Sequence, residues 1–276
     1  MTYPDTHSPY SVPGSHKWVL YVSHNRTRRL IVFIHGFGGE SVKTWKDFSQ
    51  SGHMGQWWQE ADMLFVGYDS TKENITSVAD RFNEQLPKFY PAPFAAAMNV
   101  HGVLARDEIG NYEELYLVGH SLGGLIIRRA LKQAVQQWTY SSSETPRPVI
   151  LDAQMRLFSP ASAGFQPSGT VGFLRALTGI WGLAELRLRT SSAYWDLQPD
   201  SSLIVETKRE TESMFAKTGL TALQARILWA NPDNIVRAEE YAIDSYRSSA
   251  DGRTHTSVCK PDSEYIRPWN FVQLGM

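Results

Sequence analysis

A sharp turn is encoded between an apolar run and a helical segment near the middle of the chain. The run Leu115–Val118 is followed by Gly119-His120-Ser121-Leu122-Gly123, and the segment Leu125–Trp138 then has helical spacing. In the pattern Gly-x-Ser-x-Gly, the glycines let strand and helix approach closely and the serine takes a strained backbone conformation. The pattern therefore predicts a strand–turn–helix unit that lifts the Ser121 hydroxyl above the end of a sheet, at a helix N-terminus with partial positive potential.

Short apolar runs alternate with helical segments along the rest of the chain, which is typical of a mostly parallel sheet covered by helices on both faces. We expect a helix over Ile75–Phe89 and an irregular arm over residues 1–14. Strands are expected over Lys17–Ser23, Leu30–Ile34, Met63–Tyr68, Leu115–Gly119 and Leu220–Ala230, with one more over Val149–Leu151 or in a register that extends to Phe158. No internal repeat or linker divides the chain, so residues 1–276 are expected to form a single α/β domain.

The composition argues against several classes of partner and cofactor. The chain has 276 residues, of which 42% are hydrophobic, and 27 basic residues are balanced by 28 acidic ones. Electrostatic binding to nucleic acid or to an anionic membrane surface is therefore not expected. The sequence has no phosphate-binding loop and no metal-ligand spacing, so we expect neither a cofactor nor a metal.

The cysteine content and the termini bear on location. Cys259 is the single cysteine, so the chain cannot form an internal disulfide, which fits a reducing compartment. Residues 1–9 lack the basic and apolar regions of a signal peptide, and no apolar run is long enough to cross a membrane. We expect a cytoplasmic protein without a transmembrane segment, and we leave its oligomeric state open.

Ser121 is the candidate nucleophile of an acyl-transfer site. Acyl transfer develops negative charge on a carbonyl oxygen, which preorganised backbone N–H groups stabilise. The N–H of Leu122, the residue after the nucleophile, is one expected donor. The loop His35–Gly39 follows the strand Leu30–Ile34, and we expect the Phe37 N–H to be the second donor. His35 precedes the nucleophile in the sequence and is interpreted as a structural loop histidine.

Two segments carry a resemblance to a known family. Ile31–Trp45 and Leu115–Ile127 resemble the α/β-hydrolase superfamily, and more narrowly the lipase-like serine esterase group that includes the SERAC and PGAP families. That group has an HG(L/F)GG loop followed by a Thr-Trp pair, here Thr44-Trp45. The resemblance implies the α/β-hydrolase fold with a helical cap insertion. The sequence departs from the group at Ala161, where the segment written TPHxGS has a histidine, and this puts local substrate contacts in doubt.

The chain order expected for this fold is serine, then an acid, then histidine. His255 is the only histidine after His120, so it is the expected base. In the resembling group, the catalytic histidine precedes a stretch similar to Val258-Cys259-Lys260-Pro261. Asp233 lies in a turn directly after the last expected strand and before an Ile-Val pair, where the resemblance also places an acid. The acids left open as alternatives are Asp152, Asp244 and Asp251.

An apolar stretch over Thr170–Leu188 lies between expected strands, where this fold commonly inserts a cap. We place the insertion at about residues 160–200. One interpretation is that these residues form core-packed helices. The other is a mobile cap whose apolar side chains bind the substrate, with Phe173, Leu174, Leu177 and Trp181 as the candidates.

The function predicted from these features is hydrolysis of carboxylic esters through an acyl-serine intermediate. Ser121 is the nucleophile, His255 the base and Asp233 the group that orients it. The expected substrate is a small-molecule or lipid ester. Thioester, amide and acyl-transfer chemistry use the same machinery and stay as alternatives, as does a catalytically silent binding protein on the same scaffold.

Overall fold

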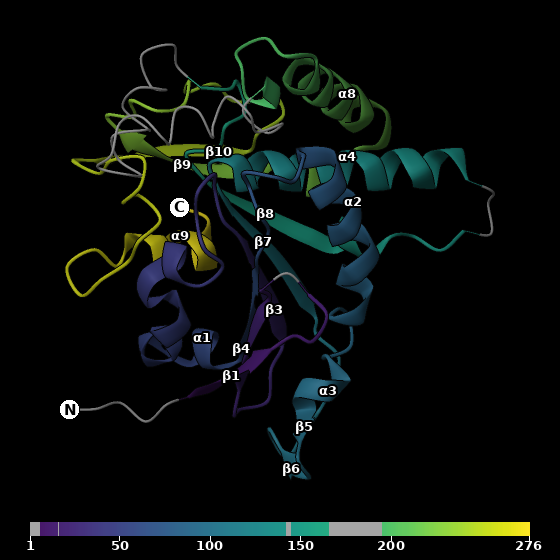
Figure 1. Ribbon diagram of the computed structural model, residues 1–276, viewed down its shortest axis with the longest axis vertical. Coiled ribbons are helices and arrows are strands. Elements are labelled where there is room, and N and C mark those ends of the chain that lie inside the picture. The colour runs from purple at the N-terminus through teal and green to yellow at the C-terminus, as the bar shows by residue number, and fades with distance from the viewer. Residues whose placement is uncertain (1–5, 16, 142–144, 166–194) are drawn as a thin grey trace.

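The structure is a computed structural model that describes residues 6–15, 17–141, 145–165 and 195–276 (Figure 1). Its centre is an eight-stranded sheet with the order β1-β2-β4-β3-β7-β8-β9-β10. Within this sheet, the six strands β4, β3, β7, β8, β9 and β10 run parallel to one another, whereas β2 is antiparallel to both β1 and β4. The strands are β1 (His7–Ser11), β2 (Val19–Ser23), β3 (Arg29–Ile34), β4 (Ala61–Val66), β7 (Glu114–His120), β8 (Ala153–Phe158), β9 (Ala225–Asn231) and β10 (Tyr246–Asp251).

Helices cover both faces of the sheet (Figure 1). One face carries α2 (Ile75–Gln85), α4 (Leu122–Tyr140) and α8 (Ser202–Thr218), and the other carries η1 (Lys43–Met54), α1 (Gln56–Gln59) and α9 (Arg267–Leu274). The remaining elements are α3 (Ala95–Met98), the short pair β5 (Asn99–Val100) and β6 (Val103–Leu104), and the 3₁₀ turns η2 (Leu86–Lys88), η3 (Val149–Asp152) and η4 (Thr221–Leu223). The predicted mostly parallel sheet flanked by helices is confirmed.

Strand β3 shows why its sequence is an uninterrupted apolar run. Leu30, Val32 and Ile34 face the core beneath α2 and α4, whereas Ile31 and Phe33 face the core beneath η1 and α9. Successive side chains of a strand point to opposite faces, so a strand buried on both sides needs apolar residues at every position. Strand β7 alternates between the two cores in the same way and leads directly into Ser121.

Several sequence-based boundaries are wrong. Residues 1–14 are not wholly irregular, because His7–Ser11 forms β1 at the edge of the sheet. An edge strand can hold the proline at position 9, since one side of it makes no ladder hydrogen bonds. The helix expected to Phe89 ends at Gln85 and continues as η2, which contains Pro87.

The remaining boundary differences lie near β8, β9 and β10. The strand left open between two registers is β8, which begins at Ala153, because Val149–Asp152 forms a 3₁₀ turn. Likewise, η4 precedes β9, so that strand begins at Ala225 and not at Leu220. Strand β10 was not expected, since its half-exposed, mostly polar sequence carries no apolar run.

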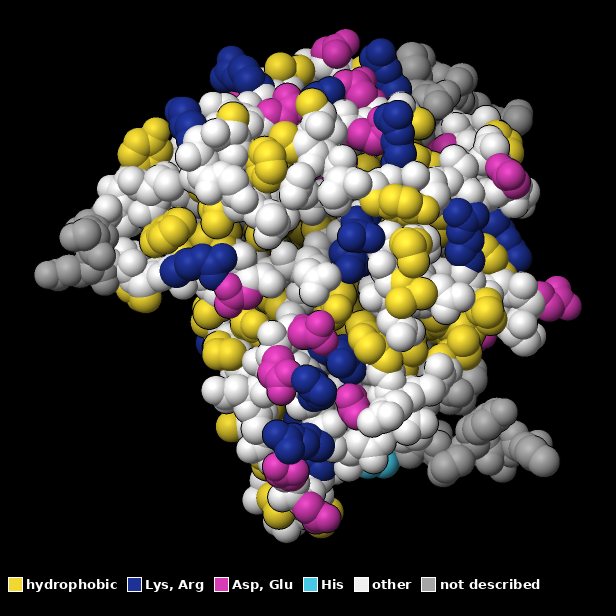
Figure 2. All heavy atoms as spheres, turned by 180° about the vertical axis from the view of Figure 1, so that it is seen from behind, with side chains coloured by type: hydrophobic (Ala, Val, Ile, Leu, Met, Phe, Trp, Pro, Cys, Tyr) yellow, Lys and Arg dark blue, Asp and Glu magenta, His cyan; other side chains and the backbone are white. Residues whose placement is uncertain are grey.

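The surface charge follows the near-equal counts of 27 basic and 28 acidic residues. Figure 2 shows basic and acidic side chains interspersed over one face of the molecule, with apolar side chains between them. Within the residues that the structure describes, no helix is long and apolar enough to cross a membrane. The cytoplasmic location stays a prediction.

Candidate active site

The turn between β7 and α4 holds Ser121 in a strained conformation. Ser121 has φ 53° and ψ −120°, a region that non-glycine residues rarely adopt. Its N–H donates to the Phe158 carbonyl at 3.0 Å, and its own carbonyl accepts from the Gly124 and Ala161 N–H groups. These three hydrogen bonds fix the elbow at the carboxyl edge of the sheet, where the serine side chain leaves the core.

Only glycine fits at positions 119 and 123, two residues before and two residues after Ser121. A Cβ added at Gly123 would lie 2.0 Å from the Ile34 carbonyl oxygen, and one added at Gly119 would lie 2.7 Å from the Gly124 nitrogen. Strand β3, strand β7 and the first turn of α4 therefore meet without a side chain between them. This is the close approach that the Gly-x-Ser-x-Gly pattern predicts.

His255 and Asp233 form a buried hydrogen-bonded pair at the same edge of the sheet. The His255 Nδ1–H donates to Asp233 Oδ2 at 2.9 Å, and the two side chains are only 2% and 3% exposed. Asp233 Oδ1 accepts from the backbone N–H groups of Ile235 and Val236 at 3.0 and 3.2 Å. Because the Nδ1–H of His255 is donated to the carboxylate, Nε2 is the ring nitrogen that can accept a proton from a nucleophile.

The surroundings of Asp233 favour its ionised form. Burial raises the pKa of the Asp233 carboxyl, but the hydrogen bond and charge of His255, the Ile235 N–H and the Ser159 hydroxyl outweigh it and hold the pKa below its usual value. Ser159 is fully buried directly after β8, and its hydroxyl oxygen also accepts the Ala230 N–H at 2.8 Å. The sequence does not identify Ser159 as a partner of Asp233. Ser159 follows β8 and Asp233 follows β9, and no local pattern links the two.

The other acids that the sequence left open have different partners. Asp244 accepts from Arg128 at 2.7 Å and from the Tyr241 and Ala225 N–H groups, away from His255. Asp152 pairs with Arg147, and Asp251 accepts from the Asn231 amide at 2.7 Å. Among the candidate acids, the hydrogen bond to His255 belongs to Asp233.

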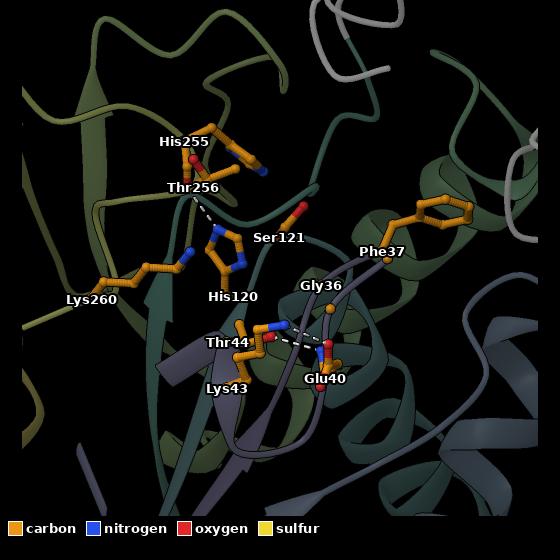
Figure 3. Close-up of a pocket in the computed structure, with 12 residues that line it drawn as sticks. Gly36, Phe37, Glu40, Lys43, Thr44, His120, Ser121, His255, Thr256 and Lys260 are labelled. Carbon is orange, nitrogen blue, oxygen red and sulfur yellow. Dashed lines mark hydrogen bonds and ion pairs between the residues drawn. The ribbon is translucent and has the colours of Figure 1, made fainter. Parts of the chain in front are cut away.

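Ser121 and His255 line one pocket of about 280 Å³, which also contacts Phe37 and Thr256 (Figure 3). No hydrogen bond joins the Ser121 hydroxyl to His255 Nε2, and neither atom has a partner among the described residues. Such bonds are often long before substrate binds and tighten afterwards. The structure thus places all three predicted side chains together, with the histidine–aspartate link formed and the serine–histidine link open.

His120 connects the elbow to the loop that carries His255. Its Nε2–H donates to the His255 backbone carbonyl at 2.8 Å, and the two rings lie 4.9 Å apart (Figure 3). Burial, together with the charge of His255, lowers the pKa of His120 to about 3, so this ring stays neutral. The sequence around His120 does not reveal this partner, which lies 135 residues further along the chain.

The expected oxyanion loop is held firmly against Ser121. The Tyr68 hydroxyl donates to the His35 carbonyl at 2.7 Å, and the His35 Nδ1–H donates to the Gly36 carbonyl at 2.8 Å. A Cβ added at Gly36 would lie 2.9 Å from that of Ser121, so loop and elbow touch. The bonding of His35 within the loop agrees with its interpretation as a structural residue.

The two expected oxyanion donors lie at this contact. Phe37 lines the pocket, and its side chain packs in the core and points away from Ser121 (Figure 3). As the first residue of α4, Leu122 has an N–H without an acceptor inside its helix. Their role as donors stays a prediction.

The candidate substrate-binding residues Phe173, Leu174, Leu177 and Trp181 lie outside the described residues. The described ends of the expected insertion are close together, because the Phe165 N–H donates to the Leu197 carbonyl at 3.0 Å. Ala161, which departs from the resembling group, is fully buried and holds the Ser121 carbonyl through its N–H. Within the described residues, no cluster of three His, Cys, Asp or Glu side chains could hold a metal ion.

At the level of sequence, the chain matches no protein-family model and no curated protein. Solved structures do match. The mature lipase BlEst2 of Bacillus licheniformis is 15% identical, with 95% of this chain and 98% of the lipase covered, at a TM-score of 0.53. The carboxylesterase CesB of Bacillus subtilis is 13% identical, with 98% and 92% covered, at 0.52. An esterase of M. tuberculosis is 12% identical, with 98% and 93% covered, at 0.54.

The chain has the α/β-hydrolase fold. At these identities the likeness establishes the fold and leaves activity to be argued from the site. The narrower resemblance to the SERAC and PGAP families stays a prediction.

Proposed function

We propose that this protein is a serine hydrolase that cleaves carboxylic esters. The observation that carries the proposal is the convergence of a strained Ser121 and an Asp233-bound His255 on one pocket. Three chain segments supply these groups, and they follow the carboxyl ends of the parallel strands β7, β9 and β10, where this fold positions catalytic residues. The lipase and esterases with the same fold, and the resemblance to SERAC- and PGAP-type esterases, support the same choice.

In the proposed reaction, His255 Nε2 takes the proton of the Ser121 hydroxyl while Ser121 Oγ attacks the ester carbonyl carbon. The negative charge that develops on the carbonyl oxygen is stabilised by the N–H groups of Leu122 and Phe37. The tetrahedral intermediate expels the alcohol, which receives the proton from His255, and leaves an acyl group on Ser121. In the second half of the cycle, His255 takes a proton from water, whose oxygen attacks the acyl carbon. The carboxylic acid leaves, and His255 returns the proton to Ser121.

Asp233 remains ionised throughout this cycle. It holds the Nδ1 proton of His255 and stabilises the imidazolium that forms twice per turnover. Cys259 does not compete as a nucleophile, because burial raises the pKa of its thiol to about 12. The acyl chain is proposed to contact the cap at about residues 160–200, through Phe173, Leu174, Leu177 and Trp181.

A panel of 4-nitrophenyl esters with acyl chains of two to sixteen carbons tests this function. We expect turnover by the wild type and a loss of at least about a thousandfold in kcat for Ser121→Ala, since the acyl-enzyme cannot form. Ser213→Ala, at an exposed position on α8, is the matched control. Thioesters and anilides of the preferred acyl chain separate the alternative chemistries. Equal turnover by wild type and Ser121→Ala would refute the proposal, and an inert wild type would favour a silent binding protein.

A further inference from the structure

The pocket beside Ser121 carries a positive charge that no described carboxylate balances. Its charged lining consists of Glu40, Lys43 and Lys260, next to the two histidines. The Lys43 ammonium lies 3.2 Å from the Glu40 carboxylate, so these two largely cancel. Among the described residues, no carboxylate lies within ion-pair distance of Lys260. A polar, cationic wall of this kind is unexpected in a site built only for hydrocarbon chains.

The backbone around Lys260 is fixed by buried neighbours. Val258 and Cys259 are fully buried, and the Val258 carbonyl accepts the Tyr265 hydroxyl at 3.0 Å. The Lys260 N–H donates to the Ser257 carbonyl at 3.0 Å. The side chain is half-buried and extends toward His120 and Thr256 (Figure 3). The half-buried Lys260 side chain therefore lines the pocket without a described carboxylate partner, and a bound anion would supply one.

The nearby acids are already engaged and do not compete for Lys260. Asp262 pairs with Lys46 at 3.2 Å and accepts the backbone N–H groups of Glu264 and Tyr265. Asp233 is occupied by His255 and by two backbone N–H groups. An anion that enters the pocket therefore meets a lysine that pairs with no described carboxylate and lies close to the catalytic base.

We propose that Lys260 binds a negative charge on the alcohol part of the substrate. This inference rests on the proposed function, in which His255 delivers its proton to the leaving oxygen. The alcohol part must therefore lie on the His255 side of Ser121, and Lys260 lies on that side, in the same chain segment. The substrate class is an ester whose alcohol part carries a carboxylate or a phosphate.

The test compares two esters that differ in leaving-group charge, 4-(butanoyloxy)benzoate and 4-(butanoyloxy)benzamide. We expect Lys260→Gln to lower the ratio of kcat/KM for the anionic over the neutral ester by about tenfold, as for one partly screened charge pair. The intrinsic reactivities cancel, since the same two esters are used for every variant. Lys260→Arg should retain the ratio, and high salt should reduce it in the wild type.

Lys88→Gln is the matched control, because Lys88 is an exposed lysine on η2 that does not line the pocket, and it should leave the ratio unchanged. A second pair places the charge on the acyl side: 4-nitrophenyl hemisuccinate against 4-nitrophenyl butanoate. If Lys260→Gln changes only this second ratio, the assignment to the alcohol part is wrong. If neither ratio changes while neutral esters are hydrolysed, the anion subsite is refuted and the hydrolase stands. If the wild type hydrolyses no ester, the proposed function fails and this inference fails with it.

Discussion

His120 is a single buried side chain that joins the nucleophile elbow to the loop of the base. It lies next to Ser121 in sequence, yet its hydrogen bond reaches the His255 carbonyl. Since burial keeps the ring neutral, its Nε2–H remains a donor without adding a positive charge beside the imidazolium that catalysis requires. The residue thus orients His255 through the backbone, while Asp233 orients it through the ring.

The lowered pKa of His120 predicts a pH dependence of stability. A histidine in the unfolded chain titrates near 6.5, whereas His120 in the folded chain titrates at about 3. Between these values the unfolded chain binds a proton that the folded chain does not, so falling pH destabilises the fold. Wild type should lose on the order of 3 kcal/mol more than His120→Gln between pH 7 and pH 4, measured by urea unfolding. Parallel pH profiles for the two proteins would contradict a neutral buried His120.

The elbow is the element in which sequence and packing agree most closely. Gly123 lies where the end of strand β3 meets the first turn of α4. A Cβ added to Gly123 would lie 2.0 Å from the Ile34 carbonyl oxygen, so there is no room for a methyl group. Any side chain there must push the helix away from the strand. That movement would also shift Ser121 and the Leu122 N–H, so stability and activity are linked at this contact.

Gly123→Ala should therefore destabilise the fold by about 3 kcal/mol or more, as overpacked buried sites do. Its urea midpoint should fall, and the fraction that remains folded should turn over esters slowly. Gly110→Ala is the control, because a Cβ there meets nothing within 4 Å. Equal stability of the two variants would mean that the close contact between β3 and α4 is wrong.

The sequence identified those elements whose local pattern is complete. Strands β3 and β7 are buried on both faces and read as continuous apolar runs, and the Gly-x-Ser-x-Gly turn has a unique geometry. Strands β1 and β10 lie at the two edges of the sheet, where half-exposed residues leave no such pattern. His255 was predicted from chain order, and Asp233 from its turn after a strand and from the family resemblance. Ser159 and the partner of His120 depend on contacts between strands that only the folded chain brings together.

At the scale of the whole molecule, a buried ion pair joins segments that are distant in sequence. Arg106 donates to both oxygens of Asp62 at 3.0 Å, and both side chains are essentially unexposed. The Ser23 N–H and the Tyr112 hydroxyl complete the shell around Asp62. This cluster ties β2 and β4 to the long connection between β6 and β7, so it holds one side of the sheet together.

Arg106→Met should cost about 3–5 kcal/mol of unfolding free energy, because it leaves a buried carboxylate without its main partner. Arg28→Met is the matched control, since its pair with Glu113 is exposed to solvent and should contribute far less to the free energy of unfolding. Denaturant unfolding measures both. A similar loss in the two variants would show that burial does not set the strength of these pairs.

The central claim is that Ser121 is a nucleophile activated by His255, and covalent labelling with a fluorophosphonate probe tests it most directly. Mass spectrometry of the labelled protein should locate the phosphonyl adduct on the Ser121 hydroxyl. The labelling rate should fall at least about a hundredfold in His255→Gln, since the base is lost. An adduct on another residue, or a rate that does not depend on His255, would contradict the account.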